Sequence, residues 1–124
     1  KIIFSVGVDS LASVSGALSG DLDPAKGMYW AWQSGYINMK IEGKSSSCKT
    51  RKNQFQFHLG GYLKPYKALR TIVLKPNNYD NINVAVDLAN FFSEVPLSQT
   101  NSVMIPGKRA MQLADRSVKM FAIE

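Results

Sequence analysis

Alternating apolar and polar residues predict several short β-strands along the chain. The clearest case is the segment 54–59, "QFQFHL", in which Phe55, Phe57 and Leu59 have one parity and two glutamines and His58 have the other. Successive side chains of a strand point to opposite faces, so this segment predicts a strand with one buried face. Shorter apolar runs predict further strands at Ile2–Val8, Ala68–Lys75 and Ile82–Leu88.

The segment Gly27–Gly43, "GMYWAWQSGYINMKIEG", holds two apolar sets of opposite parity. One unbroken strand cannot turn both sets to the same core. A single extra residue at Ser34–Gly35, a β-bulge, would bring them into register, so we expect a core-facing line from the tryptophans to Ile41. The two sets are Met28, Trp30 and Trp32, and Ile37, Met39 and Ile41.

Turn-forming residues predict loops between these strands. Residues 10–26 are rich in Ser, Gly, Ala and Asp and predict a long loop, and 43–53, "GKSSSCKTRKN", predicts a polar hairpin loop. The segment "DLANFFSEV" predicts a single helical turn. Pro106–Phe121 has the apolar spacing of a short amphipathic helix, although "KMFAIE" at its end also fits a last strand.

This pattern predicts an all-β protein, an antiparallel β-sandwich with one or two short helical turns, formed by residues 1–124 as a single domain. The chain opens directly in a strand-like run, without a signal-peptide pattern. A mature exported chain would begin this way, and so would a fragment that lacks earlier strands. We favour the fragment, and therefore expect N-terminal strands of the sandwich to be missing.

Composition and charge exclude several classes of protein. The chain has 124 residues, of which 45% are hydrophobic and 19% charged, which fits one globular domain with a core. The net charge is +6, but the basic run in the loop 44–52 is rich in serine and lacks interleaved aromatic residues. It favours a solvated loop, or contact with an acidic partner or membrane surface, over nucleic-acid binding.

No catalytic motif is complete. "EGKSS" lacks the earlier glycine of a phosphate-binding loop. In "DLDPAKG", Ala25 stands where a calcium loop needs its third acidic residue, and Lys26 would bring a positive charge to the ion. The chain has one histidine, so a hydrolytic triad would have to run through His58. We therefore expect a protein that is not an enzyme. The single cysteine, Cys48, excludes an internal disulfide and is expected to be an exposed loop residue, unless its partner lies outside this chain.

His58 is the residue best suited to a chemical role. It stands on the polar parity of its strand, beside two glycines that permit close approach of another segment. A neutral imidazole is a metal ligand, but a lone histidine on a strand is more often a hydrogen-bonded structural residue. Trp30 and Trp32 are open to the same two interpretations, because an unmodified indole offers only an N–H donor and most often fills a core.

Three stretches carry a family resemblance. "GDLDPAKGMYWAWQSGYINMKIEGKS", "FQFHLGGY" and "MIPGKRAMQLADRSVKMFAI" resemble the bacterial MbnP-like copper-binding domain, with a Met-x-Trp-x-Trp-Gln-Ser-Gly-Tyr block and a Phe-His-Leu-Gly block. The resemblance extends over nearly all of the chain. It implies an exported β-sandwich, located in the periplasm or at the outer membrane, where a lipid anchor or an outer-membrane protein complex would hold it.

The resemblance also implies a copper site. In related proteins a di-haem peroxidase of the MauG-like class oxidises a tryptophan to kynurenine, whose aryl amine can bind metal. Carried onto this sequence, Trp30 or Trp32 would be the modified residue, His58 an imidazole ligand and Met28 a thioether ligand suited to Cu(I). Such sites are expected to use more than one histidine, whereas this chain has only His58.

Two alternatives remain open. In the first, the protein keeps the fold without metal, as a structural accessory subunit or lipoprotein of an outer-membrane complex. A carbohydrate-binding sandwich is a further alternative, and it requires Trp30 or Trp32 to face solvent.

Overall fold

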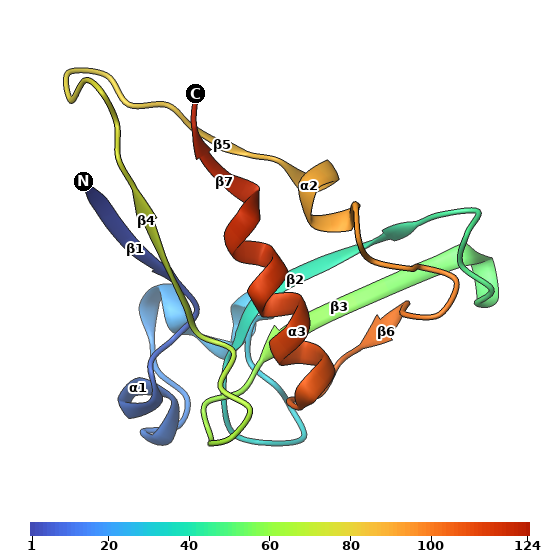
Figure 1. The fold of residues 1–124 in the computed structure, drawn as a ribbon. Helices are drawn as coiled ribbons and strands as arrows, with labels where there is room; N and C mark the ends of the chain where they lie inside the picture. Colours follow the sequence, from blue (N-terminus) through green and yellow to red (C-terminus); the bar gives the residue numbers. More distant parts are fainter.

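The computed structural model describes residues 1–124, and most of its regular structure is β-strand (Figure 1). The strands form three separate sheets, in the orders β1–β4, β2–β3–β6 and β5–β7. All pairs are antiparallel except β3–β6, which is parallel. The strands are β1 (Ile2–Val6), β2 (Ile37–Lys44), β3 (Gln54–Gly60), β4 (Arg70–Leu74), β5 (Val84–Val86), β6 (Ser102–Val103) and β7 (Phe121–Ile123).

Helices are short and lie mainly at the two ends of the chain. Four 3₁₀ turns add to three α-helices. The α-helices are α1 (Ser10–Val14), α2 (Leu88–Phe92) and α3 (Lys108–Ser117), and the 3₁₀ turns are η1 (Gly20–Leu22), η2 (Pro24–Lys26), η3 (Arg51–Asn53) and η4 (Val118–Met120). No helix of the structure is long and apolar enough to cross a membrane.

The β2–β3 hairpin confirms the predicted alternation. Phe55, Phe57 and Leu59 are buried, whereas His58 is only half-buried and Gln54 is exposed. The hairpin is connected by the polar segment 45–53, as expected, and β2 pairs with β3 along its whole length. The alternation of β3 therefore separates a core face from a face that carries polar residues.

Helix α3 covers the core face of the hairpin and closes the main core (Figure 1). Its apolar residues recur every three or four positions, so Ala110 and Leu113 point together toward the strands. Phe91 of α2 and Met120 of η4 complete the contact from the side. Burial of this cluster of nine residues supplies the main hydrophobic stabilisation of the fold.

The expected fold class is confirmed at the level of a mainly-β protein, and three details differ. We expected antiparallel strands throughout, but β3 and β6 run parallel. The amphipathic helix expected within Pro106–Phe121 is present as α3, but its ten residues exceed the one or two short helical turns of the expected fold class, and residues 10–26 hold α1 and two 3₁₀ turns instead of a plain loop. The strands form three small sheets, with α3 packed on one of them. Very short strands such as β6 carry too few residues for a sequence pattern to indicate their direction.

The prediction for Cys48 was wrong. Its side chain has no exposed surface and belongs to the main core cluster with the phenylalanines of β3. The Cys48 amide donates a hydrogen bond to the Ser45 carbonyl at 3.0 Å, and the Asn53 amide group donates one to the Cys48 carbonyl at 2.9 Å. These bonds fold the polar loop inward at Cys48, its one apolar residue. The serines and lysines around Cys48 gave no sign of this burial in the sequence.

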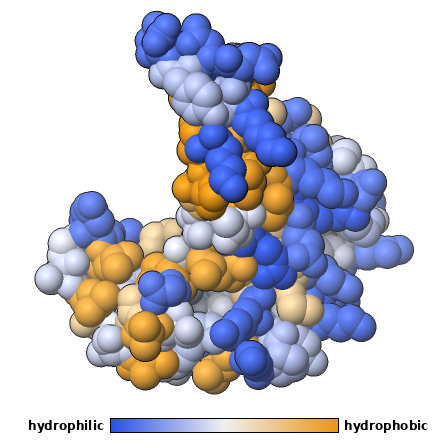
Figure 2. All heavy atoms as spheres, turned by 60° about the vertical axis from the view of Figure 1, so that its left-hand side comes forward, coloured by the Kyte–Doolittle hydropathy of each residue, from blue (hydrophilic) through white to orange (hydrophobic).

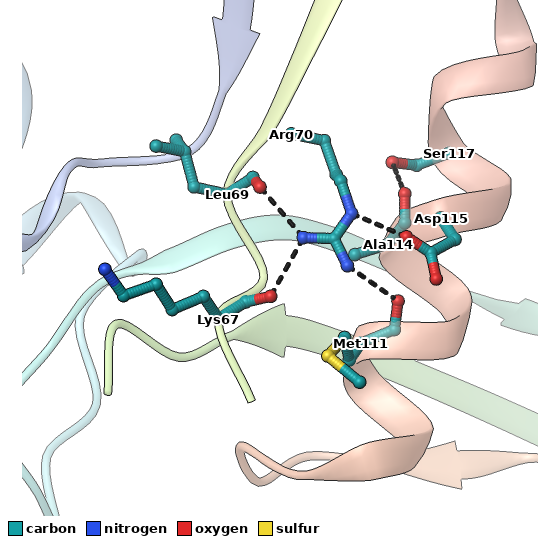
Figure 3. Close-up of polar contacts among 7 residues, drawn as sticks. All are labelled: Lys67, Leu69, Arg70, Met111, Ala114, Asp115 and Ser117. Atoms are coloured by element: carbon teal, nitrogen blue, oxygen red, sulfur yellow. Dashed lines mark hydrogen bonds and ion pairs between the residues drawn. The ribbon is translucent and has the colours of Figure 1, made fainter. Parts of the chain in front are cut away.

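Arg70, the first residue of β4, ties α3 to the rest of the molecule (Figure 3). Its Nε donates to the Asp115 carboxylate at 2.7 Å and its Nη2 donates to the Met111 carbonyl at 3.3 Å, so two of its contacts lie on α3. Its Nη1 donates to the carbonyls of Lys67 and Leu69 at 2.8 and 2.9 Å. The guanidinium therefore fixes the helix to the start of β4.

Large apolar side chains remain exposed on the β1–β4 sheet and on α1. Ile3 and Val73 face each other across the two strands and are 54% and 50% exposed, and Leu11 and Val14 of α1 are exposed as well. Figure 2 shows apolar atoms gathered in two groups on this side of the molecule, with a hollow between them. The β1–β4 sheet and α1 therefore expose several large apolar side chains on one side of the molecule.

Candidate functional site

The tryptophan segment forms a tight reversal, not the strand that we predicted. Tyr29 and Tyr36 pair in an isolated antiparallel bridge, and the Trp30 amide donates to the Gly35 carbonyl at 3.3 Å. The chain therefore turns back on itself between Trp30 and Gly35, where Gly35 has a φ of +118° that other residues rarely adopt. A parity count assumes an extended chain and cannot detect such a reversal.

The bulge itself exists, but a few residues further on. Ile37 is opposite Gly60 while Met39 is opposite Leu59, so Asn38 is the extra residue of β2. Met39 and Ile41 then pack against the main core, as expected. The predicted line from both tryptophans to Ile41 is wrong, because the reversal directs the tryptophans elsewhere.

Trp30 packs directly on Gly60, at the end of β3. A Cβ atom at Gly60 would lie 2.6 Å from Cη2 and 2.9 Å from Cζ3 of the Trp30 ring, so only glycine leaves room for the indole here. Trp30 is 4% exposed, and its Nε1 has no hydrogen-bond partner. A buried N–H without an acceptor is costly and uncommon in folded proteins, which marks this indole as a candidate for a functional role.

Trp32 is exposed, in contrast to Trp30. Its side chain is 58% accessible, and its ring centroid lies 5.8 Å from that of Trp30 with the planes tilted by 52°. The two indoles are thus in contact, one inside the protein and one at its surface. This exposure also meets the geometric requirement of the carbohydrate-binding alternative.

His58 and Glu42 form a hydrogen bond across the β2–β3 hairpin. The His58 Nε2 donates to Glu42 Oε1 at 2.5 Å, and the His58 side chain keeps only 12% of its surface accessible. This bond fixes the ring orientation and leaves Nδ1 as the second nitrogen. Histidines that bind metals commonly donate one ring N–H to a carboxylate while the other nitrogen binds the ion.

Met28, Trp30 and His58 come from different segments and share one face of the sheet. Met28 and Trp30 flank Tyr29, so both point away from the face on which Tyr29 packs against Tyr36. Trp30 contacts Gly60, which is two residues from His58 and therefore on the same face of β3. The half-buried Met28 is held there because its carbonyl accepts a hydrogen bond from Ile37 at 2.8 Å.

Lys40 adds a positive charge to the same face. It stands opposite His58 in the ladder, and its Nζ donates to the Gly27 carbonyl at 2.8 Å. This bond ties the residue before Met28 to β2.

The donor set fits a soft metal ion better than a hard one. No group of three or more His, Cys, Asp or Glu side chains in the structure could hold a metal ion. The candidate donors named from the sequence are instead one imidazole, the thioether of Met28 and the nitrogen of Trp30, which as an indole has no lone pair available. Imidazole and thioether ligands suit copper, and the soft thioether suits Cu(I) in particular.

Glu42 is the functional residue that the sequence analysis did not single out. It was placed on the polar parity of β2, but no partner was assigned to it. The signal was available, because a hairpin that pairs 37–44 with 54–60 sets Lys40 opposite His58 and brings the next polar residue, Glu42, diagonally within reach.

Comparison with known proteins gives one match. A family model described as MbnP matches residues 1–105, which includes β1 to β6 and every residue of the candidate site, while α3 and β7 lie beyond the match. No similar chain was found among curated proteins or among solved structures. Because the match covers most of the chain, the protein belongs to the MbnP family.

Proposed function

We propose that this protein is an exported, non-catalytic copper-binding protein, with copper held on the face that carries Met28, Trp30 and His58. The observation that carries the proposal is the buried Nε1 of Trp30, which has no hydrogen-bond partner and belongs to an indole whose six-membered ring packs on Gly60, two residues from His58. Copper would be held by the second ring nitrogen of His58 and the thioether of Met28.

Oxidation of Trp30 to kynurenine would supply the missing nitrogen ligand. Peroxide oxidation cleaves the Cγ–Cδ1 bond with insertion of two oxygen atoms and release of water, and hydrolysis then releases Cδ1 as formate. The product carries a ketone and a free aryl amine derived from Nε1, which is a nitrogen that can bind metal. The six-membered ring, which packs on Gly60, is unchanged by this reaction, so the packing supports Trp30 as the modified residue.

A di-haem peroxidase of the MauG-like class is the proposed maturation partner. Such an enzyme cannot contact the buried Trp30 directly, but Trp32 is exposed and its ring lies 5.8 Å from that of Trp30. The proposed role of Trp32 is to be the surface indole through which the oxidant reaches Trp30. We place this chemistry in the periplasm or at the outer membrane, with lipid anchoring as part of the proposal.

Metal titration tests the copper proposal. The purified protein is titrated with Cu(I) under anaerobic conditions against a competing chelator of known affinity, and separately with Cu(II). We expect one ion per chain and at least a tenfold loss of affinity in His58→Ala, since loss of a ligand or of the carboxylate behind it costs about 10- to 100-fold. Lys44→Ala, on the same hairpin, is the control. Equal binding by His58→Ala would contradict the proposal.

Mass spectrometry tests the modification. Cleavage after Lys26 and Lys40 releases the peptide 27–40, which contains both tryptophans. Kynurenine has one oxygen atom more and one carbon atom fewer than tryptophan, and fragmentation assigns the change to Trp30 or Trp32. We expect it at Trp30 in protein isolated from its native host. Two unmodified tryptophans in that material would contradict the maturation step but not copper binding by His58.

A structural accessory subunit is the second candidate function. The exposed apolar residues Ile3, Val73, Leu11 and Val14 favour it, because soluble monomers rarely gather such side chains on one side. Co-purification from native membranes tests it. A complex that survives in His58→Ala but not in Val73→Glu would support this role, and a free monomer in both would contradict it.

A further inference from the structure

A second surface feature is independent of the aromatic site: a groove of about 560 Å³ runs between α3 and the segment 94–100. One wall is the outer side of α3 and η4, and the other contains Glu94, Pro96 and Thr100. The buried Leu113 forms part of the floor. A volume of this order is typical of ligand sites, and most of the lining side chains are polar.

The helix wall presents a single stripe of hydrogen-bond donors. Arg109, Gln112, Arg116 and Lys119 follow one another at intervals of three or four residues, which places them on one side of the helix. Three of the four are cations. The opposite side of the same helix carries the apolar residues that pack on β3, so this stripe is not needed for the core.

The negative charges near the stripe are already engaged. The Asp115 carboxylate accepts from Arg70, which approaches from β4 (Figure 3). The Glu94 carboxylate forms an ion pair with Arg116 inside the groove, and Arg116 and Lys119 lower the pKa of Glu94. Arg109 and Lys119 take part in none of the ion pairs of the structure. The groove thus has two cations outside any ion pair, and its own two carboxylates, Glu94 and Asp115, are already engaged by Arg116 and Arg70.

We propose that this groove binds an acidic peptide segment of a partner protein, whose carboxylates contact Arg109 and Lys119 and displace Glu94 from Arg116. The Glu94–Arg116 ion pair that the peptide must replace is weak, because Glu94 is 61% exposed and ion pairs at exposed positions contribute little to the free energy of folding. Glu94 acts as an internal competitor that occupies Arg116 until the peptide arrives.

The length and openness of the groove favour a peptide over a small anion. From Arg109 to Lys119 the helix rises about 15 Å, which equals about five residues of an extended chain. A single phosphate or carboxylate would reach only one end of this stripe. The helix that carries the cations lies beyond residues 1–105, so the family match does not account for the groove.

Fluorescence anisotropy with two labelled peptides tests the proposal on the intact protein. The probes are Glu-Glu-Gly-Glu-Glu and its neutral counterpart Gln-Gln-Gly-Gln-Gln. We expect only the acidic peptide to bind, and to bind more weakly as salt is added, because exposed charges are screened over about 10 Å at 0.1 M ionic strength. Arg109→Gln and Lys119→Gln should each weaken binding by about two- to fivefold.

Two matched variants separate a built groove from general attraction to a basic protein. Lys108→Gln removes the same charge from the neighbouring exposed position outside the groove and should leave affinity unchanged. Glu94→Gln should strengthen binding, whereas Asp80→Asn, which removes a charge on a distant turn, should not. A gain of affinity cannot come from damaged folding.

Four results would overturn the proposal. The first is an equal loss of affinity in Lys108→Gln and Arg109→Gln, and the second is unchanged affinity in Glu94→Gln. The third is binding to vesicles that contain phosphatidylglycerol, weakened by Arg109→Gln, without any binding of the acidic peptide, which would identify a membrane surface as the occupant. Competition by inorganic phosphate at equal ionic strength that removes all peptide binding would likewise replace the peptide by a small anion.

Discussion

The ring of Trp30 lies against Gly60, at the one position of β3 where a side chain of any other residue would collide with it. This contact brings the aromatic block of the sequence to the block that contains His58, although 28 positions separate Trp30 from His58 in the chain. The glycine is therefore as much a part of the site as the residues with reactive groups.

Gly60→Ala should displace the indole. The new Cβ would also lie 2.6 Å from the Tyr36 carbonyl oxygen, which is backbone and cannot move aside easily. Overpacking of this kind costs roughly 1–3 kcal/mol. In a Trp32→Phe background, where Trp30 is the only tryptophan, we expect the fluorescence maximum to shift to longer wavelength. Gly16→Ala meets no atom within 4 Å but carries backbone strain at its φ of +83°, so it is the control for a loss of stability without overpacking and should not change the emission; an unchanged spectrum in Gly60→Ala would contradict the packing.

The buried thiol of Cys48 should be unreactive in the folded protein. Its side chain has no accessible surface, so a thiol reagent such as dithionitrobenzoate should label it only at the rate at which the loop opens or the protein unfolds. Cys48→Ser should lower the free energy of unfolding by roughly 1–3 kcal/mol, because a hydroxyl would enter an apolar cluster without a partner. Cys48→Ala should cost less. Immediate labelling of the native protein would show that the loop is not folded inward.

Arg70 should matter more for stability than its ion-pair partner. Arg70→Met removes the donors of three backbone carbonyls as well as the contact with Asp115, and it should cost roughly 1–3 kcal/mol in urea unfolding. Asp115→Asn removes only the charge from a residue that is 64% exposed, and should cost less than about 1 kcal/mol. The reverse order would contradict the role of Arg70 as the anchor of α3.

Glu94 should give the protein a small dependence of stability on acid pH. The hydrogen bond and charge of Arg116, with the charge of Lys119, hold the pKa of Glu94 below its ordinary value of 4.5. The stabilisation is therefore complete above pH 4.5 and is lost as the pH falls through the lowered pKa. The free energies of unfolding of wild type and Glu94→Gln should differ at pH 7 and converge as the pH falls below the lowered pKa of Glu94. A difference that grows on acidification would show that the pKa is raised instead.

The spacing of apolar residues predicted most strands and the amphipathic helix, because burial of one face of an element sets the period of its apolar positions. The alternation of β3, the β2–β3 hairpin, the turn of α2 and the amphipathic α3 were all expected from regular spacing. The reversal at Trp30–Gly35 and the burial of Cys48 were not, because each depends on a few local hydrogen bonds within an irregular segment. No periodic pattern reports such bonds.

The sequence predicted residues of the aromatic site but not the groove. Trp30, Trp32, His58 and Met28 were named from their chemistry and from the family resemblance, but Gly60 as a packing partner and Glu42 as the partner of His58 required the hairpin register. The groove was not anticipated at all. Its cations belong to the polar half of an amphipathic helix, where charged residues are ordinary and do not indicate a site. The opposite wall comes from the segment 94–100, which has no regular structure of its own.

The imidazole of His58 offers the most direct measurement of copper binding, because it is the only histidine of the chain. Protein labelled with ¹⁵N-histidine gives signals from this one ring, and Cu(I) is diamagnetic, so the signals can be followed through a titration. We predict that one equivalent of Cu(I) shifts the Nδ1 resonance strongly while Nε2, which is bonded to Glu42, shifts much less. If both nitrogen resonances stay unchanged while copper binds elsewhere on the protein or not at all, His58 is not a copper ligand and the proposed site is wrong.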